Sequence, residues 1–313
     1  MSRIKVTIMI PTFNQAIYIL DAIRSALAQT YPELEVIVGD DASSDRTADI
    51  VTAIADKRLK YIRNSVNLGR TANYRNLLIN HATGEYVINL DGDDYFTDPD
   101  FVSEAVKCIE ANENVIMVAA RVTTKFRDTE SVSPLPAETK ITGQQLLSRL
   151  PFGGYSMMHM GVMYARKPAI KIDFYRSAAI SSDWESLYRL ALDGLVAYLN
   201  RNVGVWRIHG ENESATTDME KLLDNLDIWS AIYKEARKHG MNLLAANYHQ
   251  ARCVAFYSIQ TAQKIMGRGG KVLTGFLFAI FRKNVLAGMI ILLTPAYLAV
   301  FVRGIIGKQG LQQ

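Results

Sequence analysis

The feature that most limits what this chain can fold into is a mostly apolar segment that ends abruptly in carboxylates. Residues 86–90 (YVINL) have strand character, and residues 91–94 (DGDD) follow them directly. Buried carboxylates are costly unless a cation or a ligand hydroxyl pairs with them. The glycine between them would let the backbone approach a bound group. The segment therefore predicts a divalent-cation site for a phosphate-bearing ligand, with a solvated turn before the next helix as the alternative.

Strand-like and helix-like segments alternate over the first 120 residues. The helical segments carry apolar residues at a spacing of three or four, and the strand segments are short apolar runs. This alternation is typical of an α/β fold with a doubly wound, mainly parallel sheet. We expect strands at 4–10, 34–41, 59–64, 86–90 and 115–120, with helices at 15–30, 45–55, 70–82 and 98–112.

The pattern is looser after residue 120. Residues 121–141 are polar and contain two prolines, so we expect a surface loop there. Further on we expect a short helix at 144–150, strands at 162–166, 196–200 and 203–209, and a helix at 181–192.

Three of the expected strands end in polar clusters. These clusters lie at residues 11–14, 39–45 and 91–94. In open α/β sheets, ligands bind beyond the carboxyl ends of the strands. The agreement of the three strand ends favours a binding site over an isolated acidic turn.

Charge is distributed unevenly along the chain. The net charge is +4, yet residues 236–313 contain ten Lys or Arg and no Asp or Glu. Within this region, residues 284–302 are 19 positions without a charge, between Arg282–Lys283 and Arg303. Long apolar runs with basic flanks fit an anionic membrane surface better than a nucleic acid. We therefore expect a membrane partner and no nucleic acid.

Three arrangements of residues 270–303 remain open. At ~1.5 Å per residue the uncharged run reaches ~28 Å, just enough to span a bilayer. Pro295 instead favours a broken helix that lies in the membrane plane or inserts partly, and a buried contact between copies in a homo-oligomer is the third arrangement. Basic residues are more numerous before Asn284, which predicts a catalytic domain on the cytoplasmic face of the inner membrane.

Six motifs occur in an order that is specific as a set. The chain resembles family 2 glycosyltransferases in PTFN (11–14), DDASSDRT (40–47), NLGR (67–70), TGEYVINLDGDD (83–94), SDW (182–184) and RIHGENES (207–214). The resemblance implies an inverting enzyme with a nucleotide-sugar-binding fold of the GT-A type. It also implies a single catalytic domain at residues 1–215, followed by a helical, membrane-associating region at 216–313.

The resemblance assigns roles to individual residues. It implies that the nucleotide is bound by Pro11, Thr12, Asn14, Asp41, Arg70 and Asp91, with Asp41 accepting from the uracil N–H and Asp91 reaching the ribose hydroxyls. Asp93 matches the ligand of Mn²⁺ or Mg²⁺, and His209 matches a histidine that can complete the metal shell. Asp183 matches the general base. Ala42 departs from the usual glycine after the paired acids, and Ser182 stands where a glutamate often precedes the base.

Three further side chains are candidates for binding an acceptor. Tyr155 and Trp184 could stack on a sugar or equally pack in the protein interior. His159 could contact an acceptor, although a structural role in the interior is favoured for it. The Gln-x-x-Arg-Trp motif of processive synthases is missing from the sequence. The resemblance therefore implies transfer of a single sugar per encounter.

These observations predict an enzyme of surface polysaccharide or glycan synthesis. We expect a metal-dependent transfer from a UDP-sugar to a hydroxyl of a lipid-linked glycan acceptor. One alternative is a nucleotidyltransferase acting on sugar phosphates, although residues 11–18 lack the glycine-rich basic loop that such an enzyme needs. The other is a membrane-attached carbohydrate-binding protein without catalytic activity.

Overall fold

The computed structural model describes residues 3–210, 212, 216–265, 268, 270–295, 297–299 and 302. The chain divides into two compact units. The sheet unit comprises residues 1–146, 153–178 and 182–210, and the helical unit comprises residues 147–152, 179–181 and 211–313. Some positions of the predicted motifs lie outside the described residues: Glu211, Glu213 and Ser214 of the last motif, and Ala296, Val300, Phe301 and Arg303 of the tail.

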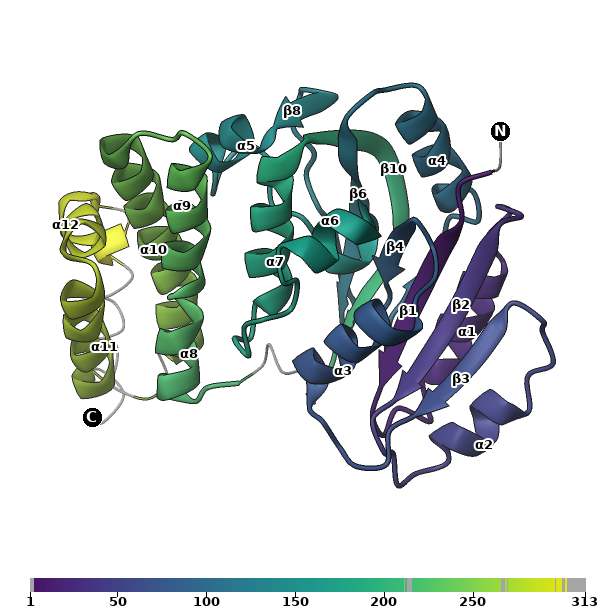
Figure 1. Ribbon diagram of the computed structural model, residues 1–313. Helices are drawn as coiled ribbons and strands as arrows, with labels where there is room; N and C mark the ends of the chain where they lie inside the picture. The colour runs from purple at the N-terminus through teal and green to yellow at the C-terminus, as the bar shows by residue number, and fades with distance from the viewer. Residues whose placement is uncertain are drawn as a thin grey trace. The chain divides into compact units, whose positions relative to one another are not determined.

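The first half of the sheet unit follows the predicted α/β pattern. Strands β1 (Val6–Thr12), β2 (Leu34–Asp40), β3 (Leu59–Arg63) and β4 (Tyr86–Asn89) run parallel in the order β3-β2-β1-β4 (Figure 1). Register pairs Thr12 with Asp40, so the carboxyl ends of β1 and β2 are level. This half places three of the predicted polar strand ends at one edge of the sheet.

The second half of the sheet is mixed, which corrects the prediction of a mainly parallel sheet. Strand β9 (Val162–Ala165) runs antiparallel to both β4 and β6 (Val115–Phe126). The long strand β10 (Leu195–Ile208) is parallel to β6 and antiparallel to β5 (Tyr95–Phe96) and β8 (Lys140–Thr142). Within the described residues, ten strands form this one sheet.

Part of the expected loop at 121–141 is β-structure. Strand β6 continues to Phe126 and pairs with β7 (Thr129–Val132) in an antiparallel hairpin. The exposed positions of this hairpin are mostly polar or charged, although Phe126 and Val132 are exposed as well. Polarity alone therefore suggested a loop, whereas β-branched threonine is favourable in a half-exposed strand. The two strands expected at 196–200 and 203–209 form one strand, β10, with register shifts where they meet.

Helices cover both faces of the parallel strands. On one face α1 (Ile19–Leu27) packs Ile19, Ile23 and Ala26 on Ile8 and Ile10 of β1. The other face carries α3 (Arg70–Asn76), which continues into a π-helical turn at Leu77–His81. The remaining helices of this unit are α2 (Thr47–Thr52), α4 (Phe101–Glu110), α5 (Gly143–Arg149, which passes into the helical unit), α6 (Arg166–Lys171) and α7 (Ser182–Leu190).

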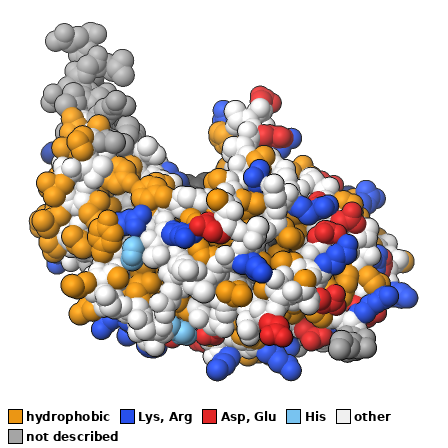
Figure 2. Space-filling view, turned by 90° about the horizontal axis from the view of Figure 1, so that it is seen from above, with side chains coloured by type: hydrophobic (Ala, Val, Ile, Leu, Met, Phe, Trp, Pro, Cys, Tyr) orange, Lys and Arg blue, Asp and Glu red, His pale blue; other side chains and the backbone are white. Residues whose placement is uncertain are grey.

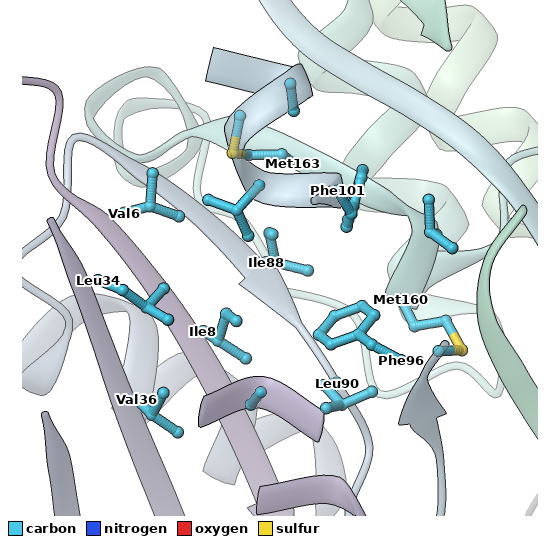
Figure 3. Packing of buried hydrophobic residues seen from close by; sticks show 14 of the residues in the cluster. Val6, Ile8, Leu34, Val36, Ile88, Leu90, Phe96, Phe101, Met160 and Met163 are labelled. Atoms are coloured by element: carbon cyan, nitrogen blue, oxygen red, sulfur yellow. The ribbon is translucent and has the colours of Figure 1, made fainter. Parts of the chain in front are cut away.

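The main core lies between the sheet and the helices α1 and α4. Alternate residues of each strand face it because successive side chains of a strand point to opposite sides. Figure 3 shows how these rows meet Phe96, Phe101, Met160 and Met163: Val6 and Ile8 from β1, Leu34 and Val36 from β2, and Ile88 and Leu90 from β4 and its end. This core fixes the strand ends that carry the polar clusters.

The helical unit consists of consecutive helices, as the sequence predicts. They are α8 (Met219–Asn225), α9 (Ile228–Lys238), α10 (Leu243–Ile265), α11 (Gly270–Lys283) and α12 (Val285–Leu293). Asn284 breaks the apolar tail between α11 and α12 and caps α12, accepting from the Ala287 amide at 2.9 Å. Over the described residues, no helix combines the length and the hydrophobicity needed to cross a bilayer.

Candidate active site

Backbone hydrogen bonds join the three polar strand ends. The amide of Asp41 donates to the carbonyl of Thr12 at 2.9 Å, and the amide of Gly92 donates to the carbonyl of Pro11 at 3.1 Å. The end of β1 is therefore held between the acidic end of β2 and the acidic end of β4. The sequence prediction that these clusters converge agrees with this geometry.

Gly92 is needed by the chain itself. A Cβ atom at this position would lie 2.4 Å from Oε1 of Gln15 and 2.9 Å from Oγ1 of Thr12. Both contacts are too short for a carbon atom. The glycine lets the acidic turn pack against the end of β1, an approach that the sequence reading had assigned to a bound group.

Asp41 is buried and accepts several hydrogen bonds from one loop. Its Oδ1 accepts from Nδ2 of Asn64 and from the amide of Leu68, and its Oδ2 accepts from the amide of Gly69, each at 2.8 Å. Only 2% of the residue is exposed. The carboxylate therefore fixes the loop that leads to Arg70 at the start of α3.

A second loop contact orders the entrance to this region. Oδ1 of Asn14 accepts from the backbone N–H of Ser44 at 2.8 Å, and the backbone N–H of Asn14 donates to Oγ of Ser43 at 2.9 Å. Both Asn14 (φ 53°) and Ala42 (φ 64°) have left-handed backbone conformations. A Cβ atom is unfavourable in this conformation, so a glycine would fit the position of Ala42 with less strain.

Asp91 lies at the end of β4 and is held by two side chains. Its Oδ1 accepts from the Tyr74 hydroxyl at 2.6 Å and from Nδ2 of Asn89 at 2.9 Å. The guanidinium of Arg70 lies over the ring of Tyr74, 5.6 Å from its centroid. These contacts place Arg70 and Asp91, which are far apart in sequence, beside one another.

Asp93 and His209 meet across the sheet unit. Nε2 of His209 lies 2.9 Å from Oδ2 of Asp93. The imidazole stacks on the ring of Tyr18, with 5.1 Å between the ring centroids. Burial raises the pKa of Asp93, and the nearby charge of Asp91 adds to this effect. The pKa of Asp94 is raised well above its usual range, mainly by burial and then by Asp93.

This donor set fits a hard divalent cation. Asp93 offers a buried carboxylate oxygen and His209 an imidazole nitrogen, and the negative charge of Asp91 acts on the same carboxylate. No group of three or more His, Cys, Asp or Glu side chains that could hold a metal occurs in the described part of the chain. A metal held here by two protein ligands would take further oxygen ligands from a diphosphate and water.

Asp183 belongs to the same region as Asp91. It lies in the first turn of α7, and Oγ of the preceding Ser182 is 3.3 Å from Oγ1 of Thr71 on α3. Burial raises the pKa of Tyr74 well above its usual value, and the charges of Asp91 and Asp183 act in the same direction. Both charges thus act on one tyrosine, although 92 positions separate the two carboxylates in the chain.

The three acceptor-binding candidates have different surroundings. Tyr155 is 5% exposed and donates its hydroxyl to Oε2 of Glu138 at 2.5 Å, an environment that favours the packing alternative. Nε1 of Trp184 donates to the carbonyl of Met157 at 2.9 Å, while the side chain remains partly exposed. Burial lowers the pKa of His159, and Asp183 and then Asp91 oppose that shift. The charges of Asp183 and Asp91 thus both act on the His159 ring.

Several residues of the site could not be recognised from the sequence alone. Tyr74 and Asn89 hold Asp91, and Arg207 donates from its backbone to Asp94 at 2.9 Å and from its side chain to the carbonyl of Asp93 at 3.2 Å. Asn89 carried the clearest signal, because a buried amide interrupts an otherwise apolar strand two positions before a carboxylate. Nothing in the local sequence marked Tyr74 or Arg207.

Comparisons with known proteins agree on one family. A model of the family "Glycosyl transferase family 2" matches residues 7–172. An uncharacterised protein of Mycobacterium tuberculosis is 31% identical over 239 residues, which is 74% of this chain and 64% of the relative. The chain thus spans less than two thirds of that relative's length.

Two characterised proteins are also similar. The Escherichia coli enzyme WfaP, a UDP-Glc:α-D-GlcNAc-diphosphoundecaprenol β-1,3-glucosyltransferase, is 41% identical over 91 residues, or 29% of this chain and 36% of WfaP. The crystal structure of residues 1–349 of Staphylococcus aureus TarS in complex with UDP-GlcNAc superposes with a TM-score of 0.68 at 19% identity. That superposition covers 98% of this chain and 92% of the TarS chain, and at this identity it shows a common fold.

Proposed function

The chain belongs to glycosyltransferase family 2, and we propose that it transfers a single sugar from a UDP-sugar to a hydroxyl of a lipid-linked glycan, with inversion at the anomeric carbon. The family match, the UDP-glucose enzyme WfaP and the shared fold support a glycosyltransferase that uses a nucleotide-sugar donor. The family match favours this activity over the nucleotidyltransferase alternative. The uridine base, the acceptor, the metal and the base residue are our proposals.

The surroundings of Asp41 support a uridine donor. A carboxylate offers about four lone-pair positions, and the chain fills two on Oδ1 and one on Oδ2. The remaining position on Oδ2 can accept the N–H of uracil. WfaP uses UDP-glucose and TarS was crystallised with UDP-GlcNAc, which favours the same nucleotide here.

The acidic turn after β4 would hold the donor through its ribose and its diphosphate. Asp91 is placed to accept from ribose hydroxyls, and Asp93 with His209 would hold Mn²⁺ or Mg²⁺. When bound, such an ion acts as a Lewis acid that stabilises charge on the diphosphate leaving group. The imidazole ligand favours Mn²⁺ over Mg²⁺.

Asp183 would accept the proton of the attacking hydroxyl. The observation that supports this proposal is that α3 contacts both groups: Tyr74 donates to Asp91 at 2.6 Å, and Oγ1 of Thr71 lies 3.3 Å from Oγ of Ser182, the neighbour of Asp183. Base assistance of this kind is typically worth ~10²–10⁴-fold in rate. A hydroxyl activated on the face opposite the leaving group gives inversion in one displacement.

The test uses Asp183→Asn and the exposed turn variant Asp128→Asn as its matched control. UDP release from UDP-glucose and from UDP-GlcNAc is measured with Mn²⁺, and UDP binding is measured by calorimetry. We expect Asp183→Asn to lose at least ~100-fold in rate with UDP affinity nearly unchanged. Asp128→Asn should behave like the unmodified protein. Lost UDP affinity in Asp183→Asn, or an unchanged rate, would contradict the assignment.

The helical unit supports a lipid-linked acceptor through an apolar face on α12. The buried side of α12 is formed by Ala287, Gly288 and Ile291, whereas its outer side exposes Val285, Leu286, Met289, Leu292 and Leu293. Hydrophobic side chains gather on the left of Figure 2, the side on which α11 and α12 lie in Figure 1. Because the chain has no acidic residue after Ala236, we propose that this face lies in the plane of an anionic membrane.

Vesicle binding tests the membrane proposal. Met289→Glu with Leu293→Glu places charge on the outer side of α12, and Leu244→Glu is a control because Leu244 is 80% exposed on α10. Burial of one such side chain is worth ~1.5–3 kcal/mol, so the double variant should bind anionic vesicles at least ~10-fold more weakly. The control should bind normally, and deletion of residues 270–313 should abolish binding. Equal binding by all variants would favour the alternative of a contact between copies, which sedimentation would detect.

We place the enzyme on the cytoplasmic face of the inner membrane. Nucleotide sugars are made in the cytoplasm. If the apolar outer side of α12 binds the membrane there, it would bring the sheet unit to a lipid-linked acceptor.

A further inference from the structure

A chain of hydrogen bonds leads from Asp91 into the interior of the sheet unit. Nδ2 of Asn89 donates to Asp91 at 2.9 Å and lies 3.4 Å from Nδ1 of His159. On the other side of the ring, Nε2 of His159 is 2.6 Å from the Tyr175 hydroxyl, which is 3.3 Å from the Tyr164 hydroxyl. Asn89 and both tyrosines are buried.

The positions of the protons along these hydrogen bonds follow from the donors and acceptors that take part. An amide nitrogen only donates, and an ionised carboxylate such as Asp91 only accepts, so Nδ2 of Asn89 must face Asp91. Nδ1 of His159 is then an acceptor, and the ring proton lies on Nε2. His159 therefore donates to Tyr175, an assignment made from the surrounding groups.

At the end of this series of hydrogen bonds, the residue Tyr175 is bound to α7, the helix that carries Asp183. The amide of Tyr175 donates to Oγ of Ser186 at 2.9 Å. Arg189, one turn further along α7, donates to the carbonyls of Ile172 at 2.6 Å and Asp173 at 3.0 Å. These contacts hold the loop before Tyr175 on α7.

The backbone of Tyr175 indicates that its position matters. Its φ is 58°, in the left-handed region that costs a bulky residue ~1–2 kcal/mol. Such a conformation persists only where surrounding contacts fix it, and it is frequent near functional sites. Here the contacts are those to His159 and Ser186.

We propose that His159 is a positioning residue that connects the donor-side carboxylate Asp91 to the helix carrying Asp183. The connection sets the distance between the bound donor sugar and the base. The inference rests on the role proposed above for Asp183. A displacement of ~1 Å between reacting groups can cost ~10²-fold in rate, so a link of this kind affects turnover more than donor binding.

The link requires a neutral imidazole. A proton on Nδ1 would direct an N–H at the amide N–H of Asn89 and break the chain. Burial lowers the pKa of His159, while Asp183 and Asp91 oppose the shift and Arg70 supports it. The groups that face the ring are Asn89 and Asp91 from the end of β4, Arg70 and Tyr74 from α3, Asp183 from α7, and Tyr175.

The experiment compares His159→Phe, His159→Gln and Tyr175→Phe with the unmodified protein. Turnover of UDP-GlcNAc with Mn²⁺, the Kd for UDP and the melting temperature are measured. We expect His159→Phe and Tyr175→Phe to lower kcat by ~10–100-fold while the Kd for UDP changes less than about threefold. His159→Gln keeps an N–H donor and should recover part of kcat. It should also lose one ionisation from the acid limb of the pH profile.

Unchanged kcat in both His159→Phe and Tyr175→Phe would overturn the proposal. Equal losses of kcat and UDP affinity would do the same, because the residues would then only shape the donor site. Should His159→Phe fail to fold, Tyr175→Phe, which removes one oxygen atom, decides. Absence of turnover in the unmodified protein would count against the proposed function instead. In that case ¹⁵N NMR of the His159 ring tests the link, and a proton on Nδ1 would refute it.

Discussion

The two acidic strand ends differ in how their carboxylates are paired. After β2, Asp40 accepts from the Ser43 amide at 2.8 Å and the Tyr61 hydroxyl at 2.5 Å, and Asp41 accepts from its loop. After β4, burial and neighbouring carboxylates raise the pKa of Asp93 and Asp94. The carboxylates of the first end accept hydrogen bonds from the backbone and from side chains, whereas at the second end the negative charges of Asp91, Asp93 and Asp94 oppose one another.

The difference separates two uses of a buried acid. A carboxylate that accepts several N–H groups is a fixed acceptor with a defined shape, suited to selecting a base. Carboxylates that crowd one another are suited to a cation, which removes their repulsion. The same residue type in similar sequence contexts can therefore serve recognition at one strand and metal binding at the next.

The largest expected effect comes from Asp93→Asn. Loss of the carboxylate should lower Mn²⁺-dependent turnover by more than ~100-fold, because even changes beside a metal ligand cost 10–100-fold. The fold should remain as stable or become more stable, since a buried charge is removed. Turnover and the melting temperature measured on one sample check both parts. A large fall in melting temperature would show that Asp93 is structurally paired like Asp41.

Asp41→Asn should lower the stability of the fold, in contrast to Asp93→Asn. The amide would turn an N–H group toward one of the loop donors, so we expect a loss of ~1–3 kcal/mol in the free energy of unfolding, together with weaker UDP binding. Urea denaturation and calorimetry measure the two effects. Asn64→Ala is the matched control, because it removes one donor and keeps the carboxylate. It should cost ~1 kcal/mol.

Glu35, at the opposite end of β2, provides a paired carboxylate outside the site. Burial alone would raise its pKa, but hydrogen bonds from Lys60, Thr7 and Thr83 outweigh burial and lower the pKa to about 2. A lowered pKa stabilises the fold above the unfolded value of 4.5, and this contribution is lost as the pH falls toward about 2. Glu35→Gln should cost ~1–3 kcal/mol at pH 7 and make the acid dependence shallower. If the free energies of unfolding of Glu35→Gln and of the unmodified protein changed with pH in parallel, Glu35 would not be the cause of the acid dependence.

The smallest effect is expected at Ala42. Because its φ is 64°, Ala42→Gly should relieve the Cβ strain and raise the free energy of unfolding by ~1 kcal/mol. Ala53→Gly is the control, since Ala53 ends α2 with φ −74° and the substitution should not stabilise the protein. A gain of similar size in both variants would remove the argument from backbone strain.

The sequence predicted the parallel half of the sheet well because its signals are local. Strands β1, β2 and β4 are mainly apolar runs closed by turn residues, and Pro11 and Gly39 lie near the ends of β1 and β2 as expected. The mixed half was missed because β9 joins β4 to β6 by antiparallel pairing between distant segments. No local pattern specifies which edge a short strand such as Val162–Ala165 will join.

The site was predictable only where chemistry marks a residue. Carboxylates at strand ends and the motif around Asp183 could be identified, as could the convergence of three strand ends. Tyr74, Arg207 and Tyr175 could not, because their roles depend on helix orientation and loop conformation. A tyrosine that binds a carboxylate has the same local sequence signal as a tyrosine of the core.

The π-helical turn at Leu77–His81 has a consequence for evolution of the site. Such a turn contains one residue more than an α-helical path would need, and successive α-helical residues are ~100° apart. Deleting a single residue there would rotate the preceding part of α3 by about that angle relative to the strand that follows. Tyr74 would then leave Asp91, and Arg70 would move with it. One additional residue thus sets the rotation of α3 about its axis and turns the side of the helix that carries Tyr74 toward the acidic turn.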